Sequence, residues 1–165
     1  NPLLYGGFGP TVAYRNFQIT AFFNFRYHQK VMNIARMNTE SMTNYDNQNT
    51  SVLRRWRYEG QVTDVPRAFY NSSYNNLGSD RFMEDASFVR MKYLTIKYTA
   101  SKKLSQKLGM KSLGIYFTGQ NLYTLTRYKG SDPETGSSDN WKTLGYDTNK
   151  TPRSIQFTLG INASF

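Results

Sequence analysis

The sequence predicts an all-β chain: five antiparallel strands of a transmembrane β-barrel, with long loops at one end. Three observations support this prediction. Apolar and polar residues alternate in five runs, short and long connections alternate between the runs, and the apolar side chains are mostly rings. Only 38% of the 165 residues are hydrophobic, yet 13 are Tyr and 11 are Phe. Such rings gather at membrane–water boundaries, although they also suit a chain that stacks rings on a ligand.

The clearest strand is predicted over residues 154–165, where the alternation has no exception. One face of this strand holds Ile155, Phe157, Leu159, Ile161, Ala163 and Phe165. The positions between them are Ser, Gln, Thr, Gly and Asn. Because successive side chains of a strand point to opposite faces, one face is apolar and the other is polar or small.

Four further runs alternate in the same way and predict strands over residues 5–14, 17–27, 88–99 and 113–126. Phe22 is out of place in the second run, and Asn121 interrupts the apolar face of the fourth. In the third run the apolar positions shift by one near Lys92 and Tyr93. One extra residue would restore the apolar face, so we expect a β-bulge there.

The connections between the predicted strands alternate in length. A tight turn near Arg15-Asn16 and the lysine-rich segment Ser101–Ser112 are short, whereas His28–Ala86 and Arg127–Pro152 are long. Loops of that length are usually functional. Outer-membrane barrels have short turns in the periplasm and longer loops outside, which would put the lysine-rich segment in the periplasm and Phe165 at the periplasmic rim.

Five strands cannot close a barrel, and open sheet edges are not tolerated in lipid. We therefore expect the remaining strands to belong to other parts of the same protein. The first residue is Asn1 rather than an initiator Met, so we expect the chain to be a fragment or a proteolytic product. A soluble, aromatic-rich β-sandwich that binds carbohydrate is the alternative, because its strands would also alternate.

The formal net charge of +10 raises the possibility of a nucleic-acid partner. The basic residues are scattered between two linkers and the strands, and no nucleic-acid-binding motif accompanies them. We therefore expect no nucleic acid, because anionic lipopolysaccharide or an acidic ligand would satisfy the charge equally well.

Five segments carry a resemblance to a known family: NPLLYGGFG at residue 1, SDRFMEDASFVRMK at 79, TGQNLYTLT at 118, YKGSDPE at 128 and PRSIQFTLGINASF at 152. Together they resemble the C-terminal end of the SusC/RagA-type TonB-dependent transporters. Their order and their spread over the whole chain make the signal specific.

This resemblance implies an outer-membrane barrel of about 22 strands, of which the chain would supply the last five. It also implies a SusD-like surface lipoprotein as a lid, and import driven by the TonB complex through an N-terminal plug that this sequence does not contain. The implied substrates are oligosaccharides or, in some members, oligopeptides. No cofactor is expected.

The first long loop holds the candidates for contact with a ligand or a lid. These are Arg54, Arg55, Trp56, Tyr58, Tyr70 and Tyr74. Arg and aromatic residues are enriched at the centres of interfaces, although the same residues could pack the loop against itself. Phe165 ends an alternating strand, so it is a candidate barrel-assembly signal or a plain rim anchor.

The sequence offers few residues for catalysis or metal binding, so we expect no enzymatic activity and no metal. Glu84 and Asp85 are adjacent and would point to opposite faces of a strand, so they cannot converge on one bond; we expect them at a solvated loop end near Arg81. His28 is the only histidine and there is no cysteine. Asp132, Glu134 and Asp139 could bind Ca²⁺, but they lack EF-hand spacing.

Overall fold

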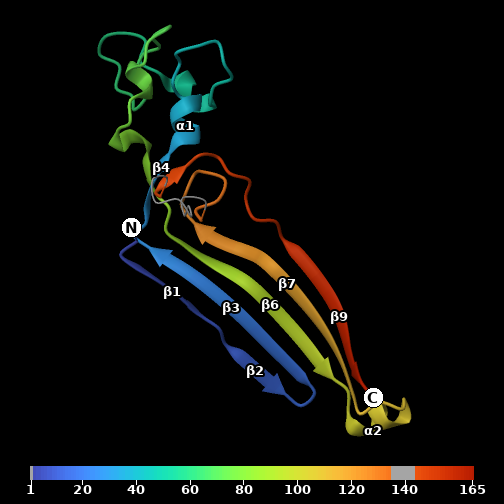
Figure 1. Ribbon diagram of the computed structural model, residues 1–165. Helices are drawn as coiled ribbons and strands as arrows, with labels where there is room; N and C mark the ends of the chain where they lie inside the picture. Colours follow the sequence, from blue (N-terminus) through green and yellow to red (C-terminus); the bar gives the residue numbers. More distant parts are fainter. Residues whose placement is uncertain (1, 135–143) are drawn as a thin grey trace. The chain divides into compact units, whose positions relative to one another are not determined.

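The computed structural model describes residues 2–134 and 144–165, which separate into two compact units. The sheet unit comprises residues 2–29, 87–127 and 153–165. The loop unit comprises residues 30–86 and 128–152. The two long connections predicted from the sequence thus form one folded unit, and the predicted strands form the other (Figure 1).

The sheet unit is one antiparallel sheet with the strand order β1-β3-β6-β7-β9, in which β2 also pairs with β3. The strands are β1 (Leu4–Phe8), β2 (Thr11–Tyr14), β3 (Phe17–Tyr27), β6 (Phe88–Thr99), β7 (Ser112–Thr126) and β9 (Gln156–Ser164). The predicted five antiparallel strands are confirmed, except that the first is divided into β1 and β2. The division falls at Gly9-Pro10, where Pro10 has no N–H to donate to the ladder.

One face of the sheet is apolar across every strand. The register aligns a row that runs from Val12 through Ile19, Ile96 and Phe117 to Leu159. These five side chains are between 38% and 72% exposed. Within the sheet unit no second sheet covers this face, unlike in the β-sandwich that the sequence left as an alternative.

The opposite face is polar and contains a row of threonines across the same strands. Thr11, Thr20, Thr95, Thr118 and Thr158 lie opposite one another in the register. The hydroxyls of Thr11 and Thr20 are 3.2 Å apart, and those of Thr95 and Thr118 are 2.9 Å apart. Cross-strand threonine pairs of this kind stabilise neighbouring strands.

The predicted bulge at Lys92 is confirmed. Phe22 pairs with Tyr93 while the adjacent Phe23 pairs with Met91, so the register between β3 and β6 skips Lys92. On β7 a second irregularity lies at Asn121, which has a φ of 52°. The apolar face continues beyond both irregularities. The breaks in the apolar–polar alternation of the sequence are therefore caused by extra residues within the strands, not by the ends of strands.

The short connections differ in detail from plain turns. Arg15 adopts a φ of 53° in the turn between β2 and β3, and the Asn16 amide donates to the Thr99 carbonyl at 2.6 Å. The lysine-rich connection contains a short helix, α2 (Lys102–Lys107). Ser101 caps its N-terminus, and its C-terminal end is followed by Gly109 at a φ of 72°.

The loop unit has secondary structure that the alternation did not predict. A small sheet in the order β5-β4-β8 joins β4 (Lys30–Asn33), β5 (Met83–Asp85) and β8 (Tyr146–Asp147). The helices are α1 (Ile34–Thr39) and the 3-10 turns η1 (Thr50–Arg54), η2 (Tyr74–Asn76) and η3 (Asp80–Phe82). Among the described residues, no helix has the length and apolarity needed to cross a membrane.

The uncovered apolar face leads to a first prediction. It compares two variants of β9, one with a charge on the apolar face and one with a charge on the polar face. Leu159→Arg should destabilise the folded barrel by about 2–4 kcal/mol, because a guanidinium near the middle of a lipid-facing strand loses its water. Thr158→Arg is the matched control, because Thr158 lies on the polar face. The measurement is urea unfolding of the complete protein in detergent or lipid. Equal losses in the two variants would contradict the assignment of the faces.

Candidate functional site

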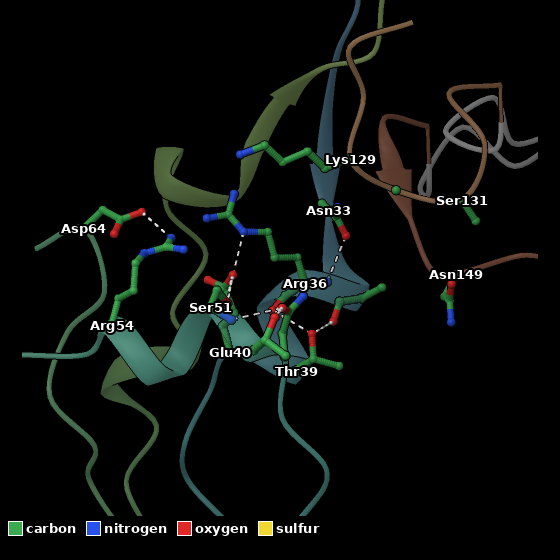
Figure 2. Close-up of a pocket in the computed structure, with 14 residues that line it drawn as sticks. Asn33, Arg36, Thr39, Glu40, Ser51, Arg54, Asp64, Lys129, Ser131 and Asn149 are labelled. Carbon is green, nitrogen blue, oxygen red and sulfur yellow. Dashed lines mark hydrogen bonds and ion pairs between the residues drawn. The ribbon is translucent and has the colours of Figure 1, made fainter. Parts of the chain in front are cut away.

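The loop unit contains an open cavity of about 490 Å³ that both long loops line. Figure 2 shows that its lining side chains are mostly polar. The first loop contributes Asn33, Arg36, Thr39, Glu40, Ser51, Arg54 and Asp64, and the second contributes Lys129, Ser131 and Asn149. Hydroxyl, amide and charged groups therefore surround a space large enough for a small ligand.

Helix α1 positions the centre of this cavity wall. Asn33, the last residue of β4, accepts a hydrogen bond from the Arg36 backbone N–H at 2.8 Å and so caps the helix. Arg36 and Glu40 are four residues apart and lie on the same side of a helical turn. Their side chains form an ion pair of 2.9 Å.

This pair is the start of a larger ion cluster, which we define as Arg36, Glu40, Arg81 and Glu84. Arg36 also binds Glu84 at 2.9 Å, and Arg81 binds Glu40 at 2.7 Å. Of the two carboxylates expected at a solvated loop end, Asp85 is exposed, but Glu84 has a side chain only 9% exposed and pairs with Arg36 instead of Arg81. The cluster ties α1 to β5 and to η3.

Glu40 is the most deeply buried member of the ion cluster, with a side chain only 2% exposed. Burial alone would raise its pKa. Hydrogen bonds from Arg36 and Ser51, together with the charges of Arg36 and Arg81, outweigh burial and hold the pKa of Glu40 below its ordinary value. The Ser51 hydroxyl donates to Glu40 at 2.7 Å, which adds η1 to the elements that the cluster joins.

A second buried contact lies within the second long loop. The Tyr128 hydroxyl donates to the Asp147 carboxylate at 2.6 Å. Burial and this carboxylate raise the pKa of Tyr128 far above the ordinary range for tyrosine. Asp147 lies in β8, whose parallel pairing with β4 connects the second loop to the first. The cavity wall is therefore built by contacts between residues distant in sequence.

The residues predicted to contact a ligand or a lid lie in different environments. Arg54 lines the cavity, and its guanidinium is 3.3 Å from the carboxylate of Asp64, with both side chains 64% exposed. Arg55 and Trp56 are half-buried: the guanidinium of Arg55 donates to the Val52 carbonyl, and the backbone N–H of Trp56 donates to the Val65 carbonyl. Tyr58 is 66% exposed.

Two of the predicted tyrosines belong to an exposed cluster, here called the tyrosine patch, which comprises Tyr45, Phe69, Tyr70 and Tyr74. The ring centroids of Tyr45 and Tyr70 are 5.1 Å apart, and those of Phe69 and Tyr74 are 6.2 Å apart. Tyr45 is 92% exposed, and sequence reasoning missed it because nothing links residue 45 to residue 70 before folding. A second polar cavity, of about 440 Å³, is lined by the sequence neighbours Asn44, Asn71 and Ser73.

The residues considered for catalysis, metal binding or assembly are far from forming a joint site. Glu84 and Asp85 are successive residues of β5, and His28 follows β3 with a φ of 54°. Asp132 is buried and accepts from the Glu134 backbone N–H at 2.9 Å, whereas Asp139 lies outside the described residues. No metal-binding group of three side chains occurs in the part of the chain that the structure describes. Phe165 is 76% exposed.

The ion cluster generates a second prediction. Glu40→Gln keeps the shape of the side chain but removes the ionic partner of Arg81 and one of the two ionic partners of Arg36. Because breaking a buried ion pair leaves an uncompensated charge, we expect the loop unit to lose about 3 kcal/mol of stability. The measurement is amide hydrogen exchange over residues 30–86. Exchange in the strands of the sheet unit should not change.

The control for this variant is Asp64→Asn, which breaks an exposed ion pair and should leave exchange unchanged. Lowering the pH provides an independent check. Since the pKa of Glu40 is depressed in the folded protein, its contribution is complete above the ordinary glutamate pKa of about 4.3 and is lost as the pH falls below it. Protection that is insensitive to both Glu40→Gln and acid would contradict the proposed role of the cluster.

Comparison with known proteins gives a consistent result, although no family model matches the chain. TonB-dependent receptor P3 of Formosa agariphila is 29% identical over 96% of this chain, and TonB-dependent receptor SusC of Bacteroides thetaiotaomicron is 36% identical over 53%. The solved RagAB peptide importer in its closed-closed state covers the whole chain, with a TM-score of 0.83 and 28% identity. The chain spans 16% of receptor P3, 8% of SusC and 17% of the matched importer chain. The resemblance predicted from the sequence is therefore confirmed: in sequence and in fold, the chain is similar to a barrel segment of the SusC/RagA-type TonB-dependent transporters.

Proposed function

We propose that this chain is part of an outer-membrane importer that takes up oligosaccharides or oligopeptides with energy from the TonB complex. The observation that carries the proposal is the sheet with two unlike faces. A row of exposed apolar side chains crosses one face, and a row of threonines crosses the other. Lipid on one side and water on the other would satisfy both faces, as in a barrel with an aqueous interior. TonB would act through a part of the protein outside this sequence.

We further propose that the loop unit faces the cell exterior and contacts the captured substrate. The cavity presents side chains from both long loops, so a ligand bound there would be held by two segments that fold together. Hydroxyl and amide groups can bind either sugar hydroxyls or peptide backbone. One of the similar solved structures is that of a peptide importer. The polar groups of the cavity are compatible with both classes of substrate.

The partner proposed for the loop unit is a SusD-like surface lipoprotein. The tyrosine patch supports this proposal, because exposed rings grouped together are typical of interface centres. Tyr45, Tyr70 and Tyr74 are between 68% and 92% exposed. Arg55 and Trp56 are weaker candidates than the tyrosines, since hydrogen bonds already hold them inside the loop.

A test of lid docking compares two double variants in the complete transporter. Tyr45→Ala/Tyr70→Ala should weaken association with the lipoprotein by tenfold or more, on the order of 1–3 kcal/mol for exposed interface rings. Arg55→Ala/Trp56→Ala should chiefly loosen the loop unit. The measurements are co-purification of the lipoprotein and uptake by intact cells. Normal lid binding in the tyrosine variant, with a correctly inserted barrel, would contradict the proposal.

The substrate class is tested on the native complex. Mass spectrometry of small molecules that co-purify with the transporter should detect either glycans or peptides, and Arg54→Ala should reduce their amount because Arg54 lines the cavity. Tyr58→Ala serves as a control outside the residues that line it. Loss of the transporter gene with unchanged uptake of both substrate classes would contradict import as the function.

Phe165 is proposed to act in barrel assembly. It directly follows β9, is 76% exposed and occupies an apolar position of the alternating sequence, and terminal aromatic residues of this kind suit the membrane boundary. Deletion of Phe165 should lower the amount of transporter in the outer membrane, measured by fractionation and immunoblotting. Unchanged levels would leave the residue with only the role of a rim anchor.

A further inference from the structure

The sheet unit contains a groove at the end with the short connections, and the groove shares no lining residue with the cavity described above. Its volume is about 530 Å³. It is lined by Lys102, Gln106, Gly109, Met110, Lys111 and Phe165. In Figure 1 helix α2 and the C-terminal end of β9 lie side by side at this end of the sheet.

The pairing of β7 with β9 places a lysine beside the ring of Phe165. Ser112 lies opposite Ser164 in the register, and the Lys111 backbone N–H donates to the Ser164 carbonyl at 2.7 Å. The ladder ends there, and Lys111 and Phe165 are the residues that flank this end of β7 and β9. Leu113 and Ala163, which are paired one step inside the ladder, continue the apolar face. The groove therefore adjoins the border of the uncovered apolar face.

Helix α2 has the distribution of side chains expected at a membrane boundary. Ser105 is buried, whereas Leu104 and Leu108 are 43% and 52% exposed and are four residues apart. Lys102 and Lys107 lie at the two ends of the same helix, and both are exposed. Exposed leucines with flanking lysines suit a helix that lies at the membrane–water interface. The leucines and the methylene groups of the lysines would contact the apolar layer, and the ammonium groups would stay in water.

The groove lysines have no carboxylate side chain available within their own unit. All 11 Asp and Glu residues of the sequence fall between residues 40 and 147, in the ranges of the loop unit. The sheet unit, by contrast, contains four lysines in residues 102–111 alone. The side chains of the sheet unit therefore carry an excess of positive charge, and an anion at the groove would meet a positive field.

We propose that this groove binds the phosphate-bearing headgroup of an anionic glycerophospholipid, with Lys102 and Lys111 as the phosphate ligands. The acyl chains would lie along the apolar face next to Phe165. A lipid satisfies both observations at once, because its phosphate complements the lysines and its chains continue the contact with the exposed face. Free phosphate would satisfy the charge alone. The inference rests on the membrane placement proposed above, and is independent of the substrate and the lid.

The test uses the complete transporter, purified in detergent and titrated with phosphatidylglycerol, with native mass spectrometry to count bound lipid. Lys102→Gln/Lys111→Gln should weaken phosphatidylglycerol binding roughly 30-fold, which is about fivefold for each lysine near an anionic headgroup. Lys103→Gln/Lys107→Gln removes the same charge from the same connection between β6 and β7 but leaves the groove lining intact. The affinity of this control variant for phosphatidylglycerol should stay within about threefold of that of the unmodified protein, because the lysines that it replaces do not bind the phosphate directly.

Two further arms separate the sources of the signal. Phosphatidylethanolamine should bind more weakly than phosphatidylglycerol, and millimolar inorganic phosphate should not displace the lipid. Equal losses in the two lysine variants would overturn the site in favour of a diffuse positive surface. Loss in neither variant, or displacement by phosphate, would also overturn it. Fractionation of the unmodified protein outside the membrane would instead mark the failure of the proposed function.

Discussion

The constraint on which the rest of the structure depends is that a membrane offers no hydrogen bonds to a polypeptide backbone. Each strand must therefore pair along its length, and each side chain must suit either lipid or water according to its parity. The apolar row from Val12 to Leu159 and the threonine row from Thr11 to Thr158 are two results of the same rule. A single sheet can satisfy both rows only if each face meets a different solvent.

Charge is distributed according to the same constraint. The sheet unit contains no Asp or Glu residue, whereas the loop unit contains all 11. The described residues of the loop unit form small apolar clusters, such as Met42, Val52 and Val65, and buried polar contacts accompany them. The ion cluster around Glu40 and the hydrogen bond from Tyr128 to Asp147 connect segments that would otherwise be long, unsupported connections. A loop ordered in this way can hold binding residues in fixed positions.

Sequence alone predicted the part of the fold that a local period controls. The alternation in residues 154–165 needs no distant information, and neither does the parity shift at Lys92. The loop unit could not be predicted in the same way. Arg36 meets Glu84 across 48 positions in the chain, and Tyr45 meets Tyr70 across 25, so no local pattern records either contact. The predicted candidates Arg55 and Trp56 illustrate the limit, because composition identified them as interface residues whereas folding places them half inside the loop.

The irregularities of the sheet show how a local break can still carry information about neighbouring strands. Two neighbouring rows of paired residues cross the three strands: Phe22, Tyr93 and Gln120 form one row, and Phe23, Met91 and Tyr123 form the next. Between these two rows β3 has no extra residue, β6 has Lys92, and β7 has Asn121 and Leu122. An extra residue in one strand alone would turn every following side chain to the wrong face. On β6 the apolar positions of the sequence shift by one at Lys92, so the side chains beyond the extra residue return to the correct face. On β7 two extra residues leave the alternation of faces unchanged. Met91 and Tyr123 therefore still meet on the apolar face. The sequence breaks at Lys92 and Asn121 therefore have a common cause, because adjacent strands must adjust together for the lipid-facing surface to remain continuous.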